Sequence, residues 1–153
     1  MAFKMGEIAP NFELVADNGE RVTLSDFRGR RVILFFFPRA ATPGCTTQAC
    51  GFRDHFPEIE SAGATVLGVS PDVPAALANW REKESLPYRL LSDPDNEVAQ
   101  LYGAYGEKSM YGKKYMGVIR SHFVIDGDGR FEDLQVKISP KKSIEKAMEQ
   151  LGG

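Results

Sequence analysis

The chain has 153 residues, of which 42% are hydrophobic and 26% charged, and these values are typical of a globular protein. Its formal net charge of −2 argues against a nucleic-acid-binding protein, because such proteins normally carry a basic face or stripe. No apolar run approaches the roughly 20 residues of a membrane helix, and the N-terminus lacks the pattern of a secretory signal, so we expect a cytoplasmic protein without membrane or nucleic-acid partners.

Short apolar runs alternate with helical patterns along the first half of the chain, as in α/β proteins. Residues 12–15 and 21–24 are predicted to form a β-hairpin around the turn Asp17-Asn18-Gly19. The run "RVILFFF" at 31–37 predicts a strand that is buried on both faces of a sheet. We expect a helix to follow from about Cys45 to Ala62, with a kink at Pro57, and then a second buried strand at 65–69.

The second half of the chain continues this alternation. It predicts a helix at 74–84, an extended segment at 86–91, a helix at 97–102, an exposed loop at 103–117, strands at "SHFVI" and "FEDLQV", and a C-terminal helix that begins at Ser139-Pro140 and ends before the Gly-Gly tail. No repeat or long linker divides the chain. We therefore predict a single domain, residues 1–153, with a thioredoxin-like α/β fold: an N-terminal β-hairpin extension and a central mixed sheet flanked by helices.

The only two cysteines lie in the stretch "TPGCTTQAC", directly after the strand at 31–37. In α/β proteins, ligands bind beyond the carboxyl ends of the strands. Cys45 is expected in the first turn of a helix, where unpaired backbone N–H groups and the helix dipole favour a thiolate. Thr42 supplies a hydroxyl nearby, and Pro38 could wall off a pocket. A cysteine merely buried in a tight strand-to-helix turn is the alternative.

The spacing of the two cysteines bears on their chemistry. On a regular helix the Cα atoms of Cys45 and Cys50 would lie about 8.7 Å apart, whereas a disulfide needs about 4.4–6.8 Å. The thiols therefore cannot bond while the helix is intact, but could do so if its first turns unwound. This suggests a folded reduced state and a locally unfolded oxidised state.

The segment Pro38-x-x-x-Thr42-x-x-Cys45 resembles the active-site motif of peroxiredoxins, and "TPGCTTQACGFRD" is similar to their bacterioferritin comigratory protein (PrxQ) subfamily. The resemblance covers nearly the whole chain and includes "GEIAPNFEL", "LLSDPDNEVAQLYG" and "YMGVIRSHFVID". It implies a thiol-dependent peroxidase of the atypical two-cysteine type, which reduces hydrogen peroxide and organic hydroperoxides.

The same resemblance implies a role for each matching residue. Cys45 would be the peroxidatic nucleophile and Cys50 the resolving thiol, which together form an intramolecular disulfide. Thr42 would bind the peroxide, Pro38 would shield the pocket, and Arg120 would stabilise the thiolate and the leaving oxygen. The family implies recycling by thioredoxin or a glutaredoxin-like dithiol, with no metal, haem or flavin cofactor. It favours a monomer, because an intramolecular disulfide needs no partner subunit.

The chain also departs from the family pattern. Gln48 stands where many relatives carry glutamate, Phe37 replaces a common tyrosine, and Arg39-Ala40-Ala41 replaces a stretch that often contains lysine and acids. These changes leave Cys45 and the other matching groups in place.

The sequence is also compatible with other functions. A thiol–disulfide oxidoreductase would share the fold, although its usual C-x-x-C spacing is absent, and a peroxide sensor or a structural role would need other evidence. A Cys–His hydrolase or a zinc site is disfavoured, because His55 and His122 match no common spacing and are interpreted as packed or solvated side chains. The segment "EKSMYGKKYMG" is interpreted as a solvated loop that could rim the pocket.

Overall fold

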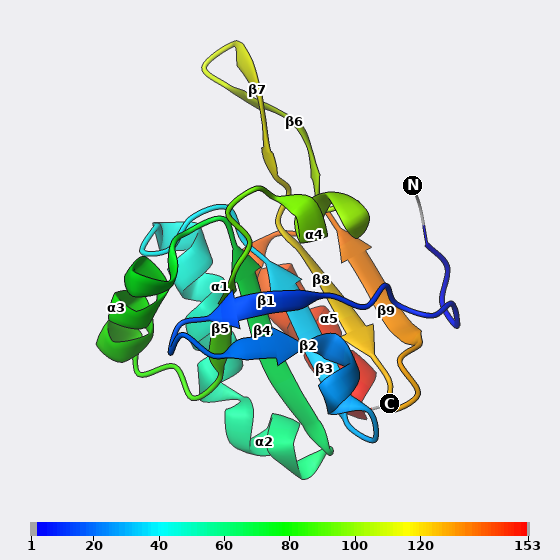
Figure 1. The fold of residues 1–153 in the computed structure, drawn as a ribbon. Coiled ribbons are helices and arrows are strands. Elements are labelled where there is room, and N and C mark those ends of the chain that lie inside the picture. Colours follow the sequence, from blue (N-terminus) through cyan, green and yellow to red (C-terminus); the bar gives the residue numbers. More distant parts are fainter. Residues whose placement is uncertain (1–2, 153) are drawn as a thin grey trace.

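A computed structural model describes residues 3–152 and shows a mixed β-sheet between two layers of helices (Figure 1). The strands of the main sheet are β1 (Glu13–Ala16), β2 (Arg21–Thr23), β3 (Arg31–Phe36), β4 (Ala64–Ser70), β5 (Arg89–Ser92), β8 (Ser121–Ile125) and β9 (Phe131–Val136). The helices are the short 3-10 helix η1 (Leu24–Phe27), α1 (Pro43–Asp54), α2 (Phe56–Ser61), α3 (Pro74–Glu84), α4 (Glu97–Leu101) and α5 (Pro140–Gly152).

The strands of the sheet lie in the order β2-β1-β5-β4-β3-β8-β9. Strands β3, β4 and β5 run parallel, whereas β8 and β9 continue the sheet in antiparallel pairing. The strands β1 and β2 form the predicted N-terminal hairpin, which joins the sheet through β5. This mixed sheet confirms the predicted thioredoxin-like layout.

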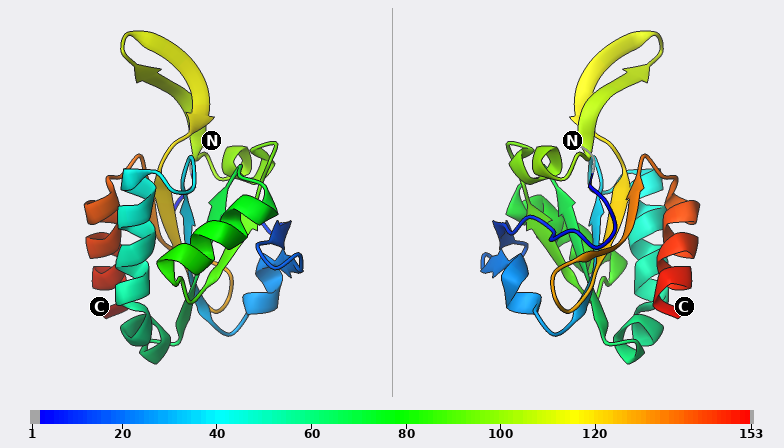
Figure 2. Two further views of the ribbon diagram at one scale, coloured as in Figure 1. Left: turned by 90° about the vertical axis from the view of Figure 1, so that its left-hand side faces the viewer. Right: turned by 90° about the vertical axis from the view of Figure 1, so that its right-hand side faces the viewer.

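Strand β3 lies between β4 and β8, because its apolar side chains can be buried on both faces. Ile33 and Phe35 pack on the face covered by α1, α3 and α5, whereas Leu34 and Phe36 pack on the face that carries α4 and η1. Helices α1 and α5 lie side by side on the first of these faces (Figure 2). The end of β3 and the start of α1 therefore meet at one edge of a tightly packed core.

The single helix predicted over 45–62 is in fact two helices, separated at His55. A proline inside a helix lacks the N–H group for its backbone hydrogen bond, and its ring clashes with the carbonyl four residues earlier. Pro57 instead lies in the first turn of α2, where its N–H is not needed. The first helix begins at Pro43, so Cys45 does lie in its first turn, as predicted.

The loop predicted at 103–117 is wrong, because this segment forms a second hairpin. Strands β6 (Tyr105–Met110) and β7 (Lys113–Val118) pair around Tyr111 and Gly112, both of which have positive φ, as in a two-residue hairpin turn. The hairpin projects from the body of the protein (Figure 1). Most of its residues are at least partly exposed, so it lacks the alternation of buried and exposed residues that marks a strand packed on a core.

The remaining differences concern the ends of elements. The extended segment predicted at 86–91 forms a strand only from Arg89, and the C-terminal helix continues to Gly152 instead of ending before the Gly-Gly tail.

Candidate active site

Cys45 is fully buried in the first turn of α1, directly beyond the carboxyl end of β3. Thr42 is the N-cap residue and Pro43 the first residue of the helix, a position at which proline is favoured. The thiol therefore belongs to the first turn of the helix, where backbone N–H groups are unpaired and the helix dipole has its positive end.

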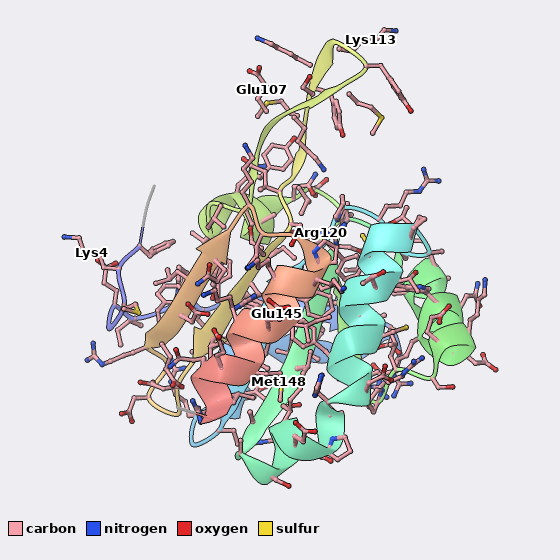
Figure 3. The ribbon with its side chains drawn as sticks, turned by 180° about the vertical axis from the view of Figure 1, so that it is seen from behind. Lys4, Glu107, Lys113, Arg120, Glu145 and Met148 are labelled. Carbon is pink, nitrogen blue, oxygen red and sulfur yellow. The ribbon has the colours of Figure 1, made fainter. Side chains whose placement is uncertain are left out.

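Arg120 approaches this sulfur from the connection between β7 and β8. Its Nη2 donates a hydrogen bond to Cys45 Sγ at 3.4 Å. Gly44 makes room for the guanidinium, because a Cβ atom at that position would lie only 3.0 Å from Arg120 Nη2. Figure 3 shows Arg120 where the ends of α1 and α5 meet. A permanently charged donor is thus in contact with the buried thiol.

Gln48 holds the other side of the same guanidinium. Its side chain is fully buried, and its Oε1 accepts a hydrogen bond from Arg120 Nη1 at 2.9 Å. Since Gln48 lies one helical turn after Cys45, both contacts of Arg120 come from α1. The amide oxygen provides an acceptor where the family pattern often has a carboxylate, so this departure does not leave Arg120 without a partner.

Thr42 and Pro38 lie close to the thiol in the chain but do not bond to it in this structure. The Thr42 hydroxyl donates to the carbonyl oxygen of Arg39 at 2.8 Å, which leaves its own oxygen able to accept a hydrogen bond. Pro38 lines a surface pocket together with Arg120.

This pocket has a volume of about 650 Å³. Pro38, Ile119 and Ile138 form apolar parts of its wall, whereas Lys108, Arg120 and Lys137 contribute cationic groups. The hairpin supplies Lys108 and its two neighbours, so this segment does rim the pocket. Glu107 and two serines also line it, so the wall combines apolar surface with groups of both charges and suits a molecule with apolar and oxygen-rich parts.

Lys108 was not singled out by the sequence, although it is the cation of the hairpin nearest the site. Its ammonium donates to the carbonyl oxygen of Val118 at 2.9 Å. Burial lowers the pKa of Lys108, and so does the charge of Arg120, whereas Cys45 acts in the opposite direction. These opposing influences indicate that Lys108, Arg120 and Cys45 share one electrostatic environment.

Cys50 lies in a different environment on the same helix. It is partly buried, and its Sγ donates to Glu84 Oε1 at 3.5 Å. Burial raises the pKa of the Cys50 thiol; Arg53 opposes this effect, while the hydrogen bond and charge of Glu84 add to it. Cys50 is therefore held as a neutral thiol while α1 is folded. The two cysteines form no disulfide with each other, as expected on an intact helix.

The two histidines lie apart from the cysteine chemistry. His55 is at the solvent-exposed break between α1 and α2, where it contacts Glu58. His122 is completely buried in β8, between Ser143 and Asp133. Across residues 3–152, no hydrogen bond joins a histidine to a cysteine, and no cluster of side chains suited to a metal ion is found.

Residues 3–152 form no helix that is long and apolar enough to cross a membrane.

Comparison with known proteins gives consistent results. Residues 5–133 match the model of the AhpC/TSA family. The chain is 51% identical over 129 residues to the protein named peroxiredoxin Bcp of Escherichia coli K12, an alignment that covers 84% of this chain and 83% of the relative.

Solved structures agree in fold over nearly the full length. Peroxidoxin BcpB from Mycobacterium tuberculosis matches with a TM-score of 0.87 and 35% identity, covering 99% of this chain and 97% of that one. A bacterioferritin comigratory protein from Xanthomonas campestris matches with a TM-score of 0.86 and 30% identity, covering 92% and 90% of the two chains.

Proposed function

The chain belongs to the AhpC/TSA family and is a peroxiredoxin, and from this premise we propose that it reduces hydroperoxides through Cys45 and Cys50, with an external dithiol as reductant. The observation that carries this proposal is the contact of Arg120 Nη2 with Cys45 Sγ at the start of α1, with a second thiol five residues later on the same helix. We assign Cys45 as the nucleophile because it is the thiol in contact with a guanidinium.

In the first step the Cys45 thiolate attacks one oxygen of the peroxide. An S–O bond forms as the O–O bond breaks, and the leaving oxygen takes up a proton and departs as water or an alcohol. Arg120 can donate to the sulfur and to the developing negative charge, which lowers the barrier. The Thr42 hydroxyl can turn from the Arg39 carbonyl to bind the peroxide, and Pro38 lines the pocket beside Arg120, where it can shield the reacting groups.

The second step requires a change in α1, because an intact helix keeps the two thiols too far apart for a disulfide. When the segment between them unwinds, Cys50 leaves Glu84 and attacks the sulfenic sulfur of Cys45. The S–S bond forms as the S–O bond breaks, and water leaves. A dithiol then restores both thiols by exchange. Thioredoxin is the proposed reductant, with a glutaredoxin-like protein as the alternative.

The proposal extends to the substrate and to the setting of the reaction. Cys45 is buried and does not line the pocket of about 650 Å³, but Arg120 lines the pocket and contacts the thiol, so we place the substrate there. This volume admits organic hydroperoxides as well as hydrogen peroxide, and the Xanthomonas campestris relative is described as having alkyl peroxide reduction activity. No metal or organic cofactor is needed for these steps. We further propose that the protein acts as a monomer in the cytoplasm, where its thiols are kept reduced.

The test is steady-state NADPH consumption with thioredoxin, thioredoxin reductase and peroxide, together with intact-mass analysis after one equivalent of peroxide. We expect turnover, and a product that has lost two hydrogen atoms and both free thiols. Cys45→Ser should abolish peroxide consumption, whereas Cys50→Ser should react once and stop at the sulfenic acid. Continued turnover by Cys45→Ser would refute the nucleophile assignment. A protein that oxidises once but is not recycled would instead act as a peroxide sensor.

A further inference from the structure

Behind Gln48, a chain of buried polar side chains continues away from the thiol. Gln48 Nε2 donates to Ser143 Oγ at 2.9 Å, Ser143 Oγ lies 2.8 Å from His122 Nδ1, and His122 Nε2 lies 3.0 Å from Asp133 Oδ2. The four residues come from α1, α5, β8 and β9. The side chains of Gln48, Ser143 and His122 are fully buried, in a part of the core that is otherwise apolar.

We propose that Ser143, His122 and Asp133 are positioning residues for the peroxidase reaction, which act by holding Gln48 and, through it, Arg120 against Cys45. The inference rests on the proposed function of Cys45. It extends the site to three side chains from α5, β8 and β9 whose hydrogen bonds reach Gln48 and one another, and not the thiol itself.

Arg120 and Asp133, the groups at the two ends of this row of hydrogen-bonded side chains, constrain which group donates in each bond. A guanidinium can only donate, so Gln48 must present its oxygen to Arg120 and its NH₂ group to Ser143. At the other end a carboxylate can only accept, so His122 carries a proton on Nε2. Ser143 accepts from Gln48, and when the His122 imidazole is neutral the Ser143 hydroxyl donates to its Nδ1. Each group thus donates to the next, from Arg120 to Asp133.

Asp133 is a suitable terminal acceptor. Burial raises its pKa, but hydrogen bonds from His122 and Gln135 outweigh that effect, and the pKa of Asp133 lies below its usual value. Its second oxygen accepts from Gln135 Nε2 at 2.8 Å. The carboxylate is therefore ionised at neutral pH and its orientation is held from both sides.

Because each of these side chains donates to the next, loss of the Ser143 hydroxyl would also affect the position of Arg120. Without the Ser143 hydroxyl, the Gln48 NH₂ group and His122 Nδ1 would both be buried without a partner, at a cost of about 1–3 kcal/mol each. A Gln48 amide that is no longer held at its NH₂ group can shift from its position, and a full turn would bring that NH₂ group toward the guanidinium, which has no acceptor. Arg120 would then lose the contact that fixes it beside Cys45.

The first test compares Ser143→Ala with Tyr102→Phe. Both remove one buried hydroxyl, but Tyr102 donates to Pro10 in the hydrophobic cluster on the other face of the sheet. In a Cys50→Ser background, which isolates the first step, we expect Ser143→Ala to slow the reaction with hydrogen peroxide by about three- to tenfold. We expect Tyr102→Phe to lower stability to urea without changing this rate. Equal rates in the two variants would overturn the proposal.

A double-mutant cycle with Arg120→Ala separates positioning from a general loss of structure. If Ser143 acts through Arg120, Ser143→Ala should have almost no further effect on the rate once Arg120 is absent. An undiminished effect in that background would overturn the proposal. Two substitutions of Asp133 provide a second comparison. Asp133→Asn keeps an acceptor for His122 and should retain most of the rate, whereas Asp133→Leu should behave like Ser143→Ala. Equal rates for Asn and Leu would contradict the assigned role.

The proton order can be observed directly by nitrogen NMR of the imidazole in the reduced protein. The chain has only two histidines, so His55→Gln assigns the signals. We expect the neutral Nε2–H form of His122, and either the Nδ1–H form or the doubly protonated imidazolium would refute the order given above. The positioning role can be tested separately from the proposed function, because Cys45→Ser tests the nucleophile without altering Gln48, Ser143, His122 or Asp133. If Cys45→Ser is inactive and Ser143→Ala is fully active, only the positioning role fails.

Discussion

Arg120 Nη2 lies 3.4 Å from Cys45 Sγ, although 75 positions separate the two residues in the chain. The contact depends on the pairing of β8 with β3, which brings the connection before β8 to the start of α1. The guanidinium is held in place because its Nη1 also donates to Gln48. Geometry, and not charge alone, should therefore determine how well Arg120 supports the reaction.

Replacement of Arg120 tests this idea. We expect Arg120→Ala to slow the reaction of Cys45 with hydrogen peroxide by about 100-fold or more, the usual effect of losing a donor to a developing oxyanion. Arg120→Lys keeps the charge but cannot donate in two fixed directions, so an intermediate rate is expected. Stopped-flow measurement of the second-order rate constant checks both. Equal rates for the lysine variant and the wild type would show that charge alone is sufficient.

Substitution of Gly44, in the first turn of α1, is a second test of whether the position of the Arg120 guanidinium matters. A Cβ atom there would lie 3.0 Å from Arg120 Nη2, so Gly44→Ala should displace the guanidinium and slow the first step by about tenfold, while leaving the unfolding free energy within about 1 kcal/mol of wild type. Gly152→Ala is the matched control, because nothing lies within 4 Å of a Cβ at that position. A Gly44→Ala enzyme with full peroxide reactivity would mean that Arg120 can shift without loss.

Gln48 lies between the two cysteines, so unwinding of this segment must pull its buried amide away from both Arg120 and Ser143. We expect Gln48→Ala to slow the first step and to accelerate formation of the Cys45–Cys50 disulfide from the sulfenic acid, since fewer interactions then oppose local unfolding. Rapid-quench mass spectrometry separates the two rates. Thr47→Ala is the control for loss of a side-chain hydrogen bond within α1, because the exposed Thr47 hydroxyl donates only to the Pro43 carbonyl and does not contact Arg120. If both steps slowed in the Gln48 variant, the amide would not restrain unwinding.

Gly51 permits the close packing of α1 on α5. A Cβ at this position would overlap the side chain of Ile144. We expect Gly51→Ala to lower the unfolding free energy by about 1–3 kcal/mol through overpacking, as measured by urea denaturation. The double variant Gly51→Ala, Ile144→Val should recover part of that loss, because the smaller side chain makes room. An additive loss in the double variant would exclude this contact as the cause.

The parts of this architecture that could be predicted from sequence are those with a local cause. The helix predicted from about Cys45 begins two residues earlier, at Pro43, and the buried position of β3 follows from its continuous apolar run. The β6–β7 hairpin was missed because its mostly exposed residues follow no pattern of burial. The buried contacts of His122 could not be inferred, since Ser143 and Asp133 come from two other elements whose register no local pattern determines. Arg120 was identified only through the resemblance to peroxiredoxins.

Cys50, the proposed resolving thiol, offers a test of how a partly buried thiol is kept unreactive while α1 is folded. Burial raises the pKa of Cys50, Arg53 opposes this, and the hydrogen bond and charge of Glu84 raise it further. Glu84→Gln removes the negative charge while keeping an oxygen that can accept from the thiol. The contribution of burial remains, so the pKa of Cys50 should fall by only part of its shift.

The measurement is the rate of alkylation of Cys50 as a function of pH, in a Cys45→Ser background so that only one thiol reacts. A lower pKa increases the thiolate fraction at a given pH, so the rate profile of Glu84→Gln should move to lower pH and the variant should react faster near neutrality. Glu82 is an exposed residue of α3, the helix that also carries Glu84, and Glu82→Gln should leave the pH profile of Cys50 alkylation unchanged. If the two variants had the same profile, burial and not Glu84 would be what keeps the Cys50 thiol unreactive.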